Sequence, residues 1–133
     1  MAEVRSAAVR AGAHRLFLKK AQEFARSMDR DLEGGDFHSA ASAASHCVIY
    51  ACDAVLARHK GIRSRSQDHG AVLGLLGTVG LEGLSARVNQ AGFVLSLKQV
   101  AECGDHEISA ADAKEAVKRA RRFLEWVEAA ALA

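Results

Sequence analysis

The stretch that decides the fold is residues 37–60, FHSAASAASHCVIYACDAVLARHK. Small side chains recur along it at spacings of four, three, four and three residues, which places them on one face of an α-helix. These positions are Ala40, Ala44, Cys47, Ala51 and Ala54. A face of small side chains lets a neighbouring helix approach closely, so we expect this helix at the centre of a bundle, with Asp53 on its flank.

Apolar side chains with helical spacing also predict helices on both sides of this stretch. The chain has no proline and 27 alanines, which favours helix throughout. Glycines at 34–35 end the first helix, and the Asp36 carboxylate is expected to cap the second. Ser64 or Ser66 can cap a short third helix, and Ser109 with Asp112 forms a capping box before the last. The expected helices cover residues 4–33 or 13–33, 37–60, a short segment around 72–76, 81–102 and 110–130.

These elements predict an all-α fold, an up-and-down bundle of four long helices plus one short helix, as a single domain over residues 1–133. The 18 basic and 16 acidic side chains nearly balance, so any nucleic-acid contact must use a local patch. The three cysteines lack CxxC spacing, which is typical of buried thiols in a reducing compartment. No leader-like or membrane-spanning run stands out, so we expect a cytoplasmic protein without a membrane contact.

The densest cationic run lies between residues 58 and 65, RHKGIRSR, and His69 follows it. His69 could serve as a base near a ribose 2′-hydroxyl, because its ordinary pKa of about 6.5 allows both protonation states near neutrality. Arg63 and Arg65 could hold phosphate oxygens. Alternatively, His69 packs at a helix start while the arginines stay solvated. Arg58 and Lys60 either bind a phosphate backbone or complement the dipole of a helix C-terminus.

Other possible sites are weaker. Cys103, Asp105, His106 and Glu107 fit no zinc-ligand spacing, and no glycine-rich phosphate loop follows a strand. Cys47 and Cys52 have no neighbour that would activate a thiolate. We therefore predict no metal and no cofactor.

Two runs resemble the HEPN family of helical domains, LEGGDFHSAASAASHCVIYACDAVLARHKGIRSRSQDHGAVLGLL at 32–76 and SLKQVAECGDHEISAADAKEAVKRARRFLEWV at 96–127. The alanine-rich second helix with its small-small-aspartate-alanine stretch at 51–54 and the histidine at 69 carry the resemblance. It implies a helical bundle that forms homodimers and associates with RNA or nucleotides, in many members as a toxin or defence endoribonuclease that needs no metal.

Ribonuclease members of that family carry an arginine followed by four to six residues and a histidine. Arg63 and His69 have this spacing, but the family motif usually lies before the last helix, where this chain has Lys98 and Gln99, with His106 further on. The alternative is a non-catalytic module that binds a partner protein, such as a nucleotidyltransferase antitoxin. Whether the chain is an enzyme stays open at this point.

Overall fold

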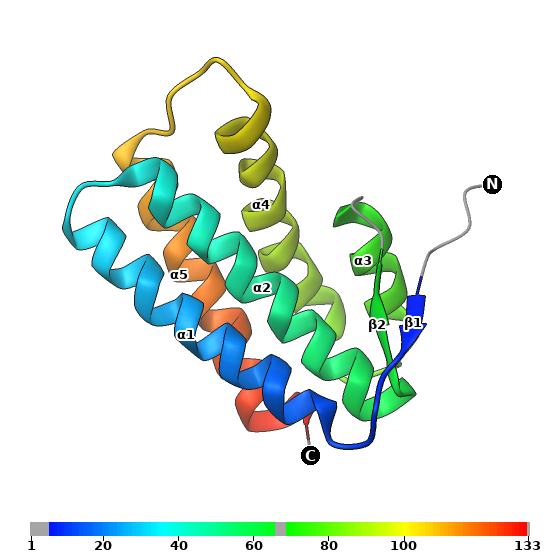
Figure 1. The fold of residues 1–133 in the computed structure, drawn as a ribbon. Coiled ribbons are helices and arrows are strands. Elements are labelled where there is room, and N and C mark those ends of the chain that lie inside the picture. Colours follow the sequence, from blue (N-terminus) through cyan, green and yellow to red (C-terminus); the bar gives the residue numbers. More distant parts are fainter. Residues whose placement is uncertain (1–5, 66–68, 133) are drawn as a thin grey trace.

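The structure is a computed structural model that describes residues 6–65 and 69–132, with the side chains of residues 69 and 101–103 outside that description (Figure 1). Five α-helices make up most of the described chain, which confirms the all-α prediction. Two short strands and a closing π-helix, which the sequence did not predict, complete it. The elements in order are β1 (Ser6–Ala8), α1 (Ala13–Glu33), α2 (Phe37–Lys60), β2 (Ile62–Ser64), α3 (His69–Gly77), α4 (Leu84–Cys103), α5 (Ala110–Trp126) and η1 (Val127–Ala131).

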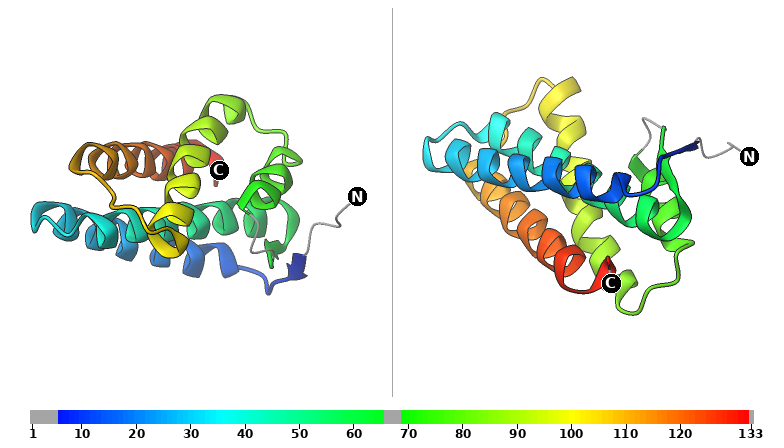
Figure 2. Two further views of the ribbon diagram at one scale, coloured as in Figure 1. Left: turned by 90° about the horizontal axis from the view of Figure 1, so that it is seen from above. Right: turned by 60° about the horizontal axis from the view of Figure 1, so that its bottom comes forward.

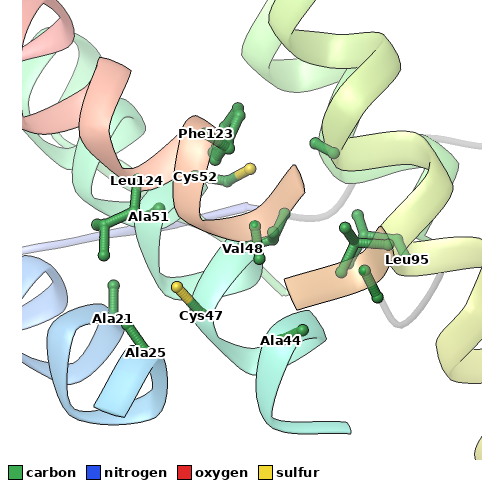
Figure 3. Close-up of a cluster of buried hydrophobic side chains, with 14 of the residues drawn as sticks. Ala21, Ala25, Ala44, Cys47, Val48, Ala51, Cys52, Leu95, Phe123 and Leu124 are labelled. Atoms are coloured by element: carbon green, nitrogen blue, oxygen red, sulfur yellow. The ribbon is translucent and has the colours of Figure 1, made fainter. Parts of the chain in front are cut away.

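Helix α2 lies at the centre of the fold, as its face of small side chains predicts. It packs most extensively against α1 and also contacts α5, α4 and α3. All five residues of the predicted face are fully buried: Ala40, Ala44, Cys47, Ala51 and Ala54. Figure 3 shows Ala21 and Ala25 of α1 opposite Cys47. Their small volume allows the two helices to pack closely along their length.

Larger apolar side chains fill the space between α2 and the helices on its other sides. Phe123 of α5 and Leu95 of α4 are almost completely buried against α2, beside Val48 (Figure 3). The predicted stripe of α5 is buried as a whole, namely Ala113, Val117, Ala120, Leu124 and Val127. The core therefore combines a close alanine contact between α1 and α2 with a thicker layer beneath α4 and α5.

Most helix ends agree with the sequence signals. Helix α1 ends at Glu33, where Gly34 donates its N–H to the carbonyl of Arg30, and Gly35 has a positive φ of 78°. The Ser109 hydroxyl accepts a hydrogen bond from the Asp112 N–H at 3.0 Å, as the capping box predicts. The predicted cap at Asp36 is wrong, because its carboxylate accepts no bond from the first turn of α2. Its backbone carbonyl accepts from Ala40 instead.

Other boundaries differ from the predictions by a few residues. Helix α4 begins at Leu84 rather than 81, because residues 81–83 form a turn that ends at Gly83. Ser64 does not cap α3 but lies in strand β2, and Ser66 lies outside the described residues. Helix α3 begins at His69, five residues after Ser64.

Strand β1 pairs with β2 in an antiparallel register that the sequence did not predict. Ala7 lies opposite Arg63, and Ala8 lies opposite Ile62. The Val9 N–H extends the pairing by donating to the carbonyl of Gly61 at 3.0 Å. Gly61 ends α2 with a positive φ of 64°, which glycine adopts without strain. As a result β1, β2 and α3 gather around the C-terminal end of α2, far from the α1–α2 turn (Figure 2).

Among the described helices, only α2 is long and apolar enough to span a membrane, judged by length and composition alone. In the structure, 72% of its apolar window is buried inside the protein, which is what the core helix of a bundle requires. Its apolar character is thus accounted for by the packing described above.

Candidate nucleic-acid interface

Four of the five residues that the sequence singled out lie at one end of the bundle with exposed side chains. Arg58 and Lys60 lie in the last turn of α2, Arg63 is in β2, and Arg65 follows it. His69 begins α3, the next described segment, but its side chain lies outside the described residues. The structure therefore places the four cations together and leaves the contact between His69 and the arginines a prediction.

The strand pairing adds N-terminal residues that the sequence analysis missed. Because Ala7 lies opposite Arg63 and Val9 bonds to Gly61, Arg10 is held near the end of α2. Helix α1 then begins beside the same end with His14 and Arg15. His14 is half-buried, and its pKa is lowered by burial and then by the nearby charges of Arg15 and Arg58. We call the exposed cations gathered here the basic end: Arg10, Arg15, Arg58, Lys60, Arg63 and Arg65.

The segments that build the basic end contain no carboxylate among the described residues. Residues 6–22 and 54–65 hold eight arginines and lysines and no aspartate or glutamate. Away from this end, Arg121 pairs with Asp29, and Arg119 pairs with Glu115 at 2.8 Å. The overall charge of +2 therefore conceals a strongly uneven distribution.

Helix dipoles account for only two of the six cations of the basic end. Arg58 and Lys60 lie at the C-terminus of α2, where a positive charge is stabilised by the helix dipole. Arg15 lies in the first turn of α1 and Arg10 just before it, where a positive charge is destabilised and an acidic residue is favoured. The first turn of α1 contains no acidic residue. The dipole of α1 therefore does not account for the cations at its N-terminus.

Asp53, which the sequence placed on the flank of α2, is the buried acidic group next to this end. Its side chain is 5% exposed. Its Oδ1 accepts a hydrogen bond from the Ser64 N–H at 3.3 Å, which ties β2 to α2. Burial raises the pKa of Asp53 to about 6, although the bond from Ser64 and the charges of Arg63 and Lys20 act in the opposite direction.

His59 has a structural role. Its Nε2 donates a hydrogen bond to the carbonyl of Ala131 in η1, which holds the end of the chain against α2. The His59 ring lies among the cations, but its Nε2 is already engaged by this hydrogen bond. No signal in the local sequence links residues 59 and 131, since the contact depends on the tertiary fold.

The other candidate groups do not form sites in the described part of the chain. His106 and Asp105 lie 3.4 Å apart with both side chains exposed, and the described residues contain no group of three or more potential metal ligands. Burial raises the pKa of the Cys47 thiol to about 12 and raises that of Cys52 as well. Neither cysteine can therefore supply a thiolate near neutral pH.

The structure is thus an all-α bundle with six exposed cations gathered at one end. The family model described as HEPN domain matches residues 14–130, which is most of the chain. The chain therefore belongs to the HEPN family, and the resemblance noted in the sequence is confirmed. A search of curated proteins found no match.

Proposed function

We propose that the protein is a cytoplasmic HEPN module that binds RNA or nucleotides through the basic end, as a component of a toxin–antitoxin or defence system. The observation that carries this proposal is that residues 6–22 and 54–65 meet at one end of the bundle and that these described segments contain no carboxylate. A nucleic-acid backbone offers a regular row of phosphates, and clustered arginines and lysines bind it by releasing its counterions. The cations at the start of α1, which the helix dipole disfavours, support the same function.

RNA cleavage without a metal is the catalytic form of this proposal. His69 would take the proton from a 2′-hydroxyl as the ribose oxygen attacks the neighbouring phosphorus. Arg63 and Arg65 would bind the phosphate oxygens, whose negative charge grows in the transition state. The bond from phosphorus to the 5′-oxygen then breaks, and the leaving oxygen takes a proton from water. The position of Arg63 and Arg65 on an exposed end beside the start of α3 supports these roles.

The binding proposal is tested by measuring the affinity for a labelled single-stranded RNA at several salt concentrations. Each phosphate contact to a single strand contributes about 0.7 to the slope of log K against log salt. The double variant Arg58→Ala/Lys60→Ala should lower that slope by about 1.4. The matched control is Lys114→Ala/Lys118→Ala, two exposed lysines on α5, which removes the same charge elsewhere and should leave the slope unchanged. An equal decrease of the slope in both double variants would refute a local binding site at the basic end.

The catalytic form is tested by incubating the protein with total RNA, with and without a chelator. Cleavage should persist with the chelator and disappear in His69→Ala, while circular dichroism confirms that the variant is folded. RNA cleavage that survives this substitution would remove His69 from the proposed site without affecting the binding proposal.

The alternative is a catalytically silent module that binds a protein, such as a nucleotidyltransferase antitoxin. A specific feature of α4 favours it: Val100 is 38% exposed, and Phe93 and Leu97 on the same side of the helix are only half-buried. Exposed apolar side chains in such a row are typical of a protein contact. The same row would also serve a homodimer, whose two copies would bury it against each other.

Co-expression and light scattering separate these outcomes. A nucleotidyltransferase that co-purifies with the wild type but not with Val100→Asp, while RNA binding is absent, would select the silent module. A wild type of twice the chain mass that becomes monomeric in Val100→Asp would assign the row to a homodimer. A monomer that captures no partner would exclude both uses of α4.

A further inference from the structure

A stack of three aromatic rings lies on the flank shared by α1 and α2. The Phe24 ring of α1 lies between two rings of α2, with its centre 5.0 Å from that of His46 and 5.7 Å from that of Tyr50. The ring planes are nearly parallel, at 22° and 11°. We call Phe24, His46 and Tyr50 the aromatic strip. All three side chains are half-buried, so the stack is on the surface and not in the alanine-rich core.

The aromatic strip continues into the basic end. The Lys20 ammonium lies 5.2 Å from the centre of the Tyr50 ring, in a cation–π contact. Tyr50 is one helical turn before Asp53, and both Lys20 and Arg63 lie close enough to Asp53 to act on its charge. Lys20 therefore contacts Tyr50 of the aromatic strip, and both Lys20 and Arg63 of the basic end lie near Asp53.

Leu16 extends the same side of α1 towards its N-terminus. It lies four residues before Lys20, hence on the same helix face, and it is 42% exposed. Only one other large apolar side chain in the described residues, Val100 of α4, is exposed. Aromatic and apolar surface thus lies directly beside clustered cations.

This combination is the one that proteins use for unpaired nucleotides. Aromatic rings stack on bases, which are accessible only in single strands, while cations follow the phosphates. A duplex hides the base faces and offers phosphates alone. A lysine over a tyrosine ring suits the place where the aromatic strip meets the basic end. Its flexible stem can move aside from the ring, so that its ammonium group binds the phosphate of the stacked nucleotide.

We propose that the aromatic strip binds unpaired bases of the RNA strand whose phosphates are held by the basic end, so that the ligand is single-stranded RNA. The inference rests on the proposed function. It adds recognition of the base, whereas the basic end binds only the phosphates. Tyr50 stacks on a base, and Lys20 bridges the stacked base to the phosphates at Arg63.

The test compares two labelled oligomers of equal length, one with bases and one abasic. Stacking of one base should make the oligomer with bases bind about 5- to 150-fold more tightly than the abasic one. Tyr50→Leu keeps apolar volume but removes the ring, so it should abolish this preference while leaving abasic binding unchanged. Tyr50→Phe should restore it. The matched control is Phe37→Leu at the other end of α2, which removes a half-buried ring outside the strip and should leave this preference unchanged.

A second measurement does not depend on the stability of the Tyr50 variants. Tyr50 is the only tyrosine and Trp126 the only tryptophan of the chain. In a Trp126→Phe protein, the emission of Tyr50 should be quenched by the oligomer with bases, and not by the abasic oligomer or by a duplex.

The possible failures of the two proposals are distinguishable. Equal affinity for both oligomers, with no quenching, would overturn the stacking inference and leave the basic end as a phosphate site. Absence of binding to either oligomer would overturn the proposed function as well. Quenching by a co-expressed protein, with none by RNA, would assign the strip to a protein contact and refute the inference.

Discussion

The two ends of the α1–α2 pair have opposite charge. At one end, Arg10 and Arg15 from the N-terminal segment meet the cations that end α2. At the other, residues 31–36 and 104–109 hold five carboxylates and no lysine or arginine, around a cleft of about 350 Å³ lined in part by Asp36, His38 and Glu107. We call these carboxylates the acidic end: Asp31, Glu33, Asp36, Asp105 and Glu107.

This difference shows that net charge is a poor guide to the ligands of the protein. A charge of +2 predicts no attraction for a polyanion, whereas under the proposed function the separation of charges along the bundle provides a surface for one. Because of its carboxylates, we expect the acidic cleft to disfavour phosphate despite its size. The comparison therefore predicts that a change of charge affects ligand binding at the basic end and not at the acidic end.

The largest effect is expected from reversing one charge at each end. Arg63→Glu should weaken RNA binding about tenfold or more at low salt, because it replaces a charge-assisted contact with repulsion. Glu33→Lys is the matched change at the acidic end and should alter the affinity less than twofold. Titration of a labelled oligomer measures both. A gain with Glu33→Lys as large as the loss with Arg63→Glu would show that only total charge matters.

Asp53 gives a pH-dependent effect on stability at the basic end. Its pKa is about 6 in the folded protein and 3.8 in the unfolded chain, so the folded state holds the proton more tightly. The protonated carboxyl therefore stabilises the fold below pH 4, and this contribution is lost as the pH rises to 6 and above. The loss amounts to about 1–3 kcal/mol, since one pKa unit is worth about 1.4 kcal/mol.

Asp53→Asn checks this sign, because asparagine stays neutral and keeps an acceptor for the Ser64 N–H. The difference in free energy of unfolding between Asp53→Asn and wild type, from urea titrations, should increase in favour of the variant between pH 4 and 7. A difference that is constant over this range would show that burial does not perturb the carboxyl.

Two glycines offer a matched pair of backbone changes. Gly35 at the acidic end and Gly61 at the basic end both have positive φ, and open space surrounds the position of an added Cβ at each. Alanine should therefore cost about 1 kcal/mol at either position through backbone strain alone. Thermal unfolding should show similar losses, while RNA affinity should fall only in Gly61→Ala, because only Gly61 joins α2 to β2. Equal RNA affinity in both variants would mean that the geometry of β2 is unimportant for binding.

The smallest effect is expected at the cap of α5. Ser109→Ala removes the acceptor for the Asp112 N–H and should cost about 1 kcal/mol of stability. RNA binding should be unchanged, because the cap lies at the acidic end. A loss of affinity in a variant that unfolds as expected would indicate that the two ends are coupled.

Local patterns in the sequence predicted the helices but not the strand pair that packs at the C-terminal end of α2. The alanine face defined α2, and capping residues defined its neighbours, because these signals act within one or two turns of helix. The β1–β2 pair was missed because three-residue strands carry no alternation and because their partners lie more than fifty residues apart. The burial of Asp53 was missed for the same reason, since it results from β2 packing against α2.

The candidate site was predicted in part. Arg58, Lys60, Arg63 and Arg65 lie on one exposed end, as their density in the sequence suggested, whereas the roles of these residues and of His69 stay predictions. Arg10, His14 and Arg15 were missed because nothing in the sequence shows that β1 lies beside β2. A signal was nevertheless present, since residues 6–22 contain four cations and no carboxylate.

The most direct test of the account is an NMR titration of the backbone amides with a short single-stranded RNA. Shift changes should cluster at residues 8–15 and 20–24 and also at residues 58–65, which lie far from the first two ranges in sequence. Changes centred on residues 31–38 and 104–109, or no specific changes at all, would contradict the claim that the basic end is the ligand-binding surface.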